Sequence, residues 1–147
     1  MTGATFKARG AYPTARALRS LLQELFAQSL RQIELLECED YEALDEVLTR
    51  KACLAEMLAA VLEQARKLGW ELQDPSTYPV QGPCVPVIRD AAELSTRLQA
   101  HEKYCLGEMI ARKSRIGERL TSLLNRRTAA AGYRIPRVRG NTIDTER

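Results

Sequence analysis

Hydrophobic residues recur every three or four positions over three long stretches of the chain, with polar residues between them. This is the spacing of helices that each bury one face, and it predicts an all-α fold. The first stretch follows Pro13, where Thr14 is suited to cap a helix that ends near Leu36. The row of this helix comprises Leu18, Leu22, Leu25, Ser29, Ile33 and Leu36.

A second apolar row follows the acidic residues 37–40. Asp40 is placed to cap this helix and Gly69 to end it. No glycine or proline separates the first two helices, so the pattern leaves open one bent helix instead of two. Lys51 falls on the apolar row and interrupts it with a charge. The row comprises Leu44, Val47, Leu48, Leu54, Leu58, Val61, Leu62, Ala65 and Leu68.

Residues 69–89 lack helical periodicity and contain four prolines. They predict a long loop, which usually marks a functional segment. We expect Trp70 and Tyr78 to hold part of this loop against the helices. The run VPVI at 85–88 resembles a short strand, but no second run is present to pair with it.

Asp90 is placed to cap a third helix, which the pattern extends to Ala131. Its row comprises Leu94, Leu98, His101, Cys105, Met109, Arg112, Ile116, Leu120 and Leu123. The row is weak in its middle, where His101, Cys105 and Arg112 stand in place of leucine. Such a row indicates partial exposure, a groove or a seam between copies of the chain.

The predicted architecture is an antiparallel bundle of three long helices, with a Pro/Gly-rich loop before the third. We expect one bundle domain over residues 1–131, including the loop 69–89, and an extended, flexible basic tail over 132–147. The tail has no helical row and too few apolar residues to fold alone.

The charge of the chain is unevenly distributed. Residues 1–108 carry 12 basic and 16 acidic groups, whereas residues 109–140 carry 9 basic groups and 1 acidic group. Six acids and no base lie between Glu37 and Glu46. Such polarity can steer a partner or hold the two ends of the molecule together.

The chemistry-bearing residues do not indicate an enzyme. His101 and Cys105 share a helix face and are half of a metal site, but no further ligands complete it, and no glycine-rich phosphate loop is present. We therefore expect no catalysis, cofactor or metal. The four cysteines lack a paired CxxC spacing and are predicted to be free thiols.

No segment has the apolar length of a signal peptide or a membrane span. The sequence therefore predicts a protein that stays in the cytoplasm and is not inserted into a membrane.

The order of these features resembles the flagellar type III export chaperones of the FlgN type and their FliT-like relatives. The resemblance spans Arg16 to Tyr133: a leucine-rich helix, a second helix after an acidic turn, a Pro/Gly loop, a third long helix and a tyrosine near the C-terminal end. Its most specific part is a spaced pattern formed by Leu35, Asp40, Leu44, Leu48, Lys51, Leu54 and Leu58.

The resemblance implies a protein that binds the C-terminal helices of hook-associated flagellar proteins and keeps them unassembled until secretion. It assigns client binding to the third helix, at Leu98, Cys105, Met109, Ile116, Leu120 and Leu123. It assigns docking to the export apparatus to Arg126, Arg127, Tyr133, Arg134 and Arg137.

The alternative prediction is a small helical nucleic-acid-binding protein. Its basic C-terminal segment could neutralise phosphates, and its one tyrosine could stack on a base. No helix-turn-helix, zinc or RNA-binding motif accompanies the arginines. The basic residues are Arg112, Lys113, Arg115, Arg119, Arg126, Arg127, Arg134, Arg137 and Arg139.

Overall fold

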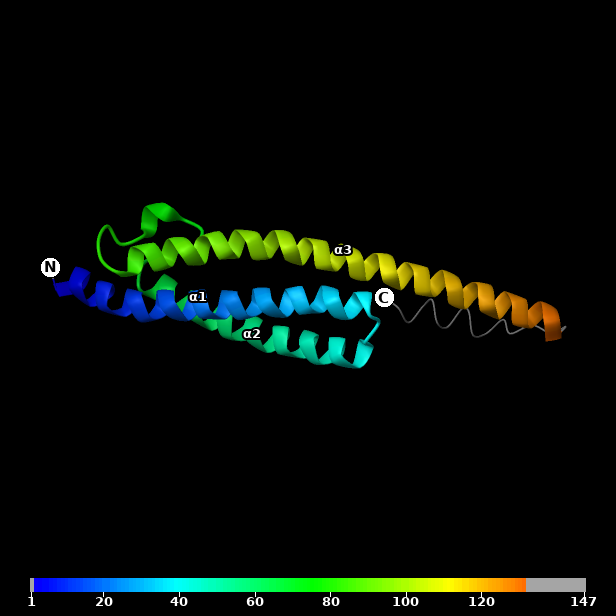
Figure 1. Ribbon diagram of the computed structural model, residues 1–147. Coiled ribbons are helices and arrows are strands. Elements are labelled where there is room, and N and C mark those ends of the chain that lie inside the picture. The colour runs from blue at the N-terminus through cyan, green and yellow to red at the C-terminus, as the bar shows by residue number, and fades with distance from the viewer. Residues whose placement is uncertain (1, 132–147) are drawn as a thin grey trace. The chain divides into compact units, whose positions relative to one another are not determined.

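The computed structural model describes the backbone of residues 2–131 and the side chains of residues 10–126 (Figure 1). Three long helices follow one another along the chain: α1 (Thr2–Glu37), α2 (Tyr41–Lys67) and α3 (Cys84–Ala131), with a short 3-10 helix, η1 (Pro75–Thr77), before α3. The predicted all-α fold of three long helices is confirmed. The predicted tail, residues 132–147, lies outside the described residues.

The chain divides into two compact units, Met1–Glu108 and Met109–Arg147. The first unit contains α1, α2, η1 and the beginning of α3. Of the second unit, the structure describes the continuation of α3 over residues 109–131. The sequence had suggested one domain over residues 1–131 instead.

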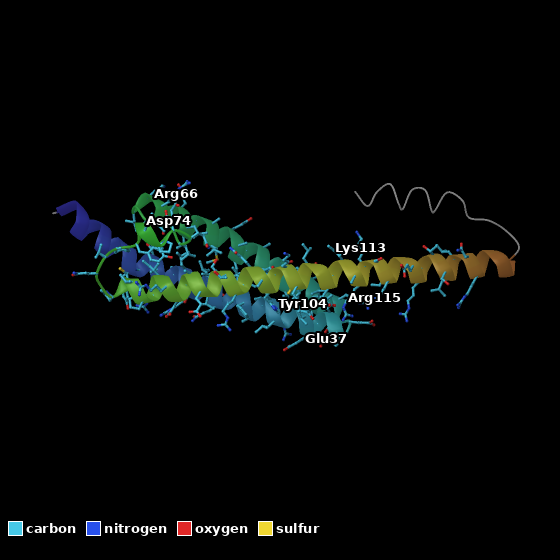
Figure 2. All side chains as sticks on the ribbon, turned by 90° about the horizontal axis from the view of Figure 1, so that it is seen from above. Glu37, Arg66, Asp74, Tyr104, Lys113 and Arg115 are labelled. Atoms are coloured by element: carbon cyan, nitrogen blue, oxygen red, sulfur yellow. The ribbon has the colours of Figure 1, made fainter. Side chains whose placement is uncertain are left out.

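The core of the first unit lies where three helices pack side by side, each running opposite to the one before it (Figure 1). Side chains from α1, α2, the loop and α3 all contribute to it. In Figure 2, Glu37 lies at one end of this unit, and Arg66 and Asp74 lie at the other. The most buried core members include Ala11, Ala15, Leu18, Leu22, Leu54, Trp70, Cys84, Ile88 and Ala91.

The start of α1 corrects the sequence prediction. Thr14 was expected to cap the helix, but α1 begins at Thr2 and Pro13 lies inside it. The Thr14 hydroxyl instead donates to the carbonyl oxygen of Gly10, 2.9 Å away and one turn earlier, as threonine does within a helix. Ala11 is fully buried here. Packing of this segment therefore compensates for the hydrogen bond that proline cannot donate.

The turn between α1 and α2 shows that they are two helices rather than one bent helix. Glu39 has a φ of 59°, so it leaves the helical conformation. Its amide donates to Leu36 O at 3.3 Å, and the amide of Asp40 donates to Leu35 O at 3.1 Å, which together close α1 with a Schellman motif. The Asp40 carboxylate then accepts from the amide of Ala43 at 3.1 Å, so the predicted cap of α2 is confirmed.

The end of α2 also follows the prediction. Gly69 has a φ of 95°, a conformation that glycine adopts without steric cost. Its amide donates to Arg66 O at 3.0 Å, and the amide of Trp70 donates to Ala65 O at 3.1 Å. This is a second Schellman motif, with glycine at the position that favours it.

The loop after α2 is held against the helices by its aromatic residues, as expected. Trp70 is 2% exposed, and its ring meets the ring of Tyr78 edge to face at 6.3 Å. The Tyr78 hydroxyl donates to the carbonyl oxygen of Leu72, which is itself buried in the core. Burial raises the pKa of this hydroxyl, and the charge of Asp74 adds to the effect.

The start of α3 corrects a second boundary. The loop was expected to extend to residue 89, but α3 begins at Cys84, and the run VPVI is helical. The reason is that Cys84, Val87, Ile88 and Ala91 repeat at helical spacing and are all buried. Pro86 is tolerated because it lies in the first turn, where an amide has no helical acceptor.

Candidate binding surface on α3

The first half of the predicted client-binding row belongs to the core of the first unit. Leu98 is 7% exposed and Cys105 is 1% exposed. Asp90, expected to be the cap of this helix, lies within it and pairs with Arg19 of α1 at 3.6 Å. The prediction that Leu98 and Cys105 contact a client is therefore corrected, since a side chain already covered by the fold offers no surface to a client.

Polar side chains from three helices meet beside this core. The ammonium group of Lys51 in α2 lies 2.6 Å from Oε1 and 2.8 Å from Oε2 of Glu102 in α3. It also donates to Oε1 of Gln32 in α1 at 2.6 Å, and the Ser29 hydroxyl donates to Glu102. The charge of Lys51, whose side chain is 10% exposed, is thus fully paired. We call Ser29, Gln32, Lys51 and Glu102 the polar node.

The polar node was only partly visible in the sequence. Ser29 and Lys51 stand out there as polar residues on apolar rows. Gln32 and Glu102 also fit the helical spacing, between Ser29 and Leu36 and between Leu98 and Cys105, but the predicted rows placed Ile33 and His101 there instead. A buried polar residue requires partners, but the sequence does not say which helix supplies them.

Cys105 packs against the polar node as a thiol. Its Sγ donates to the carbonyl oxygen of Ser29 at 3.6 Å. Burial raises the pKa of this thiol, and the negative charge of Glu102 raises it further. A raised pKa keeps the sulfur protonated, which is the opposite of what a nucleophilic cysteine requires.

His101 is held by aromatic rings. Its ring stacks on that of Phe26 at 5.5 Å with 11° between the planes, and it meets the ring of Tyr104 at 6.0 Å. Among the residues that the structure describes, no group of three or more His, Cys, Asp or Glu side chains could hold a metal ion. His101 contacts two aromatic rings and Cys105 contacts a backbone carbonyl oxygen within the first unit.

The second half of the predicted row is uncovered. Ile116 is 42% exposed, Leu120 56% and Leu123 57%. These three residues are separated by four and three positions, so they lie on one side of the helix. Met109, half-buried, is one heptad before Ile116 on the same side. We call Met109, Ile116, Leu120 and Leu123 the apolar row of the second unit.

The residues assigned to docking are only partly described. Arg126 is exposed on α3. The backbone of Arg127 continues α3, but its side chain lies outside the described set. Tyr133, Arg134 and Arg137 also lie outside the described residues, so their assignment stays a prediction.

A groove in the first unit was not predicted from the sequence. It has a volume of ≈ 580 Å³ and is lined by leucines and by polar residues. It escaped prediction because Leu72 belongs to the loop and to no helical row. The leucines that line it are Leu22 of α1, Leu58 and Leu62 of α2, Leu72 of the loop and Leu98 of α3.

None of the helices within residues 2–131 combines the length and the apolar character that crossing a membrane requires. Comparisons of the chain with protein-family models, curated proteins and solved structures find no match. The resemblance to flagellar export chaperones therefore stays a prediction.

Proposed function

We propose that this chain is a cytoplasmic binding protein that shields an amphipathic helix of another protein, in the manner of a flagellar type III export chaperone of the FlgN type. The observation that carries the proposal is the exposure of Ile116, Leu120 and Leu123 on one side of a helix. No catalytic step is involved.

Leaving the apolar row of the second unit in water costs free energy that a bound helix would recover. Covering a large apolar side chain completely stabilises a complex by about 1.5–3 kcal/mol. Binding must also overcome about 4–15 kcal/mol of lost freedom, so a client has to cover several members of the row at once. A helix can do this, because its own apolar side chains repeat at the same spacing.

The first unit is suited to be the stably folded part of the protein, which supports the helix that binds the client. Its core is continuous across three helices, and the polar node satisfies the one lysine on the apolar row of α2. Stabilising the fold and contacting the client are thus assigned to different segments of α3. Leu98 and Cys105 stabilise the fold, whereas the apolar row contacts the client.

The clients that the resemblance suggests are the C-terminal helices of hook-associated flagellar proteins. Covering these helices would keep the proteins soluble and unassembled until secretion. For the C-terminal segment we propose docking to the export apparatus, through Arg126, Arg127, Tyr133, Arg134 and Arg137. Deleting residues 132–147 should leave client binding intact and abolish export, and normal secretion by the truncated protein would remove this role.

The direct test is complex formation in solution. The purified full chain is mixed with C-terminal fragments of hook-associated proteins at micromolar concentration and analysed by gel filtration. A discrete complex is expected, which should be lost in the double variant Ile116→Glu/Leu120→Glu. Ser114→Glu/Thr121→Glu is the matched control, because it adds the same charge to exposed polar positions of the same helix. Absence of co-elution with the wild-type chain would contradict the proposal.

Nucleic-acid binding is the second candidate, and the exposed arginines of the second unit favour it. It would produce a gel shift that weakens steeply with salt, because phosphate contacts release counterions. The apolar row would then have no partner, since phosphates and sugars offer no matching apolar row. The helix-binding proposal accounts for both the arginines and the leucines.

A further inference from the structure

Three arginines form a second row on the helix that carries the apolar row. Arg115, Arg119 and Arg126 are separated by four and seven positions, so they share one side of the helix. All three side chains are exposed. None of them forms an ion pair with another residue of the described part of the chain. We call Arg115, Arg119 and Arg126 the arginine row.

The arginine row runs directly beside the apolar row. Arg115 precedes Ile116 by one residue, and Arg119 precedes Leu120 by one residue, so each arginine is turned from its apolar neighbour by the same fraction of a helical turn. The opposite side carries Ser114, Thr121 and Asn125, together with the exposed Ile110. Figure 2 shows Lys113 and Arg115 pointing to different sides of the helix. The cations of the arginine row thus flank one edge of the apolar row.

We propose that the client helix carries a row of carboxylates beside its own apolar row, and that the arginine row selects clients by these carboxylates. This inference rests on the proposed function, because it specifies the chemistry of the client at the same surface. The occupant is therefore an acidic amphipathic helix of another protein.

Charge complementarity carries the inference. In paired helices, the residues that flank the apolar seam contact the flanking residues of the partner and decide which partner is accepted. A guanidinium group offers a planar fork of donors that matches a carboxylate in two-point geometry. Since the second unit has five basic residues and one acidic residue over 109–126, a basic client helix would be repelled along the whole surface.

Within residues 10–126, whose side chains the structure describes, the acidic segment is not a suitable partner for this surface. The acids of residues 37–46 are exposed at the α1–α2 turn. However, Leu44 in this segment is 6% exposed and buried in the first unit, which leaves Tyr41, 48% exposed, as a single large uncovered side chain beside these acids. A second copy would therefore bring carboxylates without an apolar row beside them, and a separate client supplies both.

The experiment uses the full chain and two peptides of three heptads. Both peptides have Leu at positions a and d; one has Glu at positions e and g, and the other has Lys there. Like charges at these positions keep each peptide from pairing with itself. Fluorescence anisotropy of labelled peptide measures the affinity at low and at physiological salt.

The wild-type chain is expected to bind the Glu peptide at least about tenfold more tightly than the Lys peptide, with the difference shrinking as salt screens the charges. The variant Arg115→Glu/Arg119→Glu should reverse this preference. The control Arg31→Glu/Arg89→Glu makes the same change of charge in the first unit and should retain the wild-type preference.

Equal binding of the two peptides, or a preference that the charge reversal leaves unchanged, would overturn the inference while leaving the proposed function standing. Failure of hook-associated fragments to co-elute would instead contradict the proposed function itself. Two further outcomes would overturn the inference in favour of another occupant. One is binding to phosphatidylserine-containing vesicles with no binding to the Glu peptide. The other is a dimer in sedimentation that excess Glu peptide does not dissociate.

Discussion

Lys51 and Glu102 join α2 to α3 through two contacts, with the lysine ammonium group 2.6 Å from Oε1 and 2.8 Å from Oε2 of the carboxylate. The lysine side chain is 10% exposed and the glutamate side chain 41%. The pair is therefore asymmetric: loss of the carboxylate would leave a buried cation, whereas the carboxylate itself partly faces water. A substitution of Glu102 therefore leaves the buried ammonium group of Lys51 without its charged partner.

Replacing Glu102 should destabilise the fold because Lys51 would lose its charged partner. We expect Glu102→Gln to lower the free energy of unfolding by about 1–3 kcal/mol, measured by urea denaturation. Glu93→Gln, at an exposed position of the same helix, should change it by less than about 0.5 kcal/mol. The double variant Lys51→Met/Glu102→Leu should recover most of the loss. Equal stability of Glu102→Gln and the wild type would show that the pair contributes nothing.

The turn between α1 and α2 contains a residue that glycine could replace with a gain in stability. Glu39 has a φ of 59°, a conformation that disfavours residues with a Cβ atom. Glu39→Gly should raise the free energy of unfolding by about 0.5–1 kcal/mol. Glu39→Gln removes the same charge without relieving the backbone and should have a smaller effect. If both variants gained equally in a thermal melt, the gain would come from charge and not from conformation.

The helix ends show how far the sequence determines the fold. The Asp40 cap and the stop at Gly69 were predictable because each depends on local chemistry, a side-chain acceptor or a residue without a Cβ atom. The start of α1 was not, because tertiary packing around Ala11 overrides the usual effect of Pro13. The start of α3 could not be predicted, because its prolines and β-branched residues are typical of a loop or a strand. The sequence does not show that the apolar residues there are buried on one side of a helix.

The four cysteines should react in two classes. Cys38 and Cys53 are exposed, whereas Cys84 and Cys105 are 2% and 1% exposed. In the native protein, a thiol reagent such as Ellman's reagent should modify two thiols quickly, and all four after denaturation. Rapid modification of Cys105 in the native state would contradict its burial against Ser29.

Cys105 also gives a pH dependence of stability. Burial raises the pKa of its thiol in the folded state, so the unfolded chain ionises first. The contribution to stability is present below the pKa of an unfolded thiol, about 8.5, and is lost as the pH rises through the folded pKa. Between pH 7 and 10, the stability of Cys105→Ala should therefore fall less steeply than that of the wild type.

The two halves of the predicted client-binding row should respond differently to mutation. Leu98→Ala removes buried contacts and should lower the free energy of unfolding by about 2–4 kcal/mol. Leu120→Ala, at a side chain 56% exposed, should change it by no more than about 0.5 kcal/mol and weaken client binding. Stability is measured by urea denaturation and binding by titration of a hook-associated fragment. A large loss of stability in Leu120→Ala would mean that this side chain is part of the core.

The sequence predicted the helix face of the candidate surface but not which of its residues are exposed. The spacing identified Ile116, Leu120 and Leu123 together with Leu98 and Cys105, because all five have the same periodicity. Periodicity states which side chains share a helix face, but it does not state whether a neighbouring helix covers that face. Only the packing of α1 against α3, through contacts such as that of Cys105 with Ser29, separates the two groups.

Coverage of the apolar row of the second unit by a client helix can be measured by amide hydrogen exchange of the full chain with and without a hook-associated fragment. A helix whose apolar side chains are uncovered opens readily, because little packing stabilises its hydrogen bonds. If a client helix covers this row, residues 109–126 should exchange fast in the free protein and at least about tenfold more slowly in the complex, with exchange in α1 and α2 unchanged. Slow exchange there in the free protein, or protection by the client confined to α1 and α2, would contradict coverage of this row by a client.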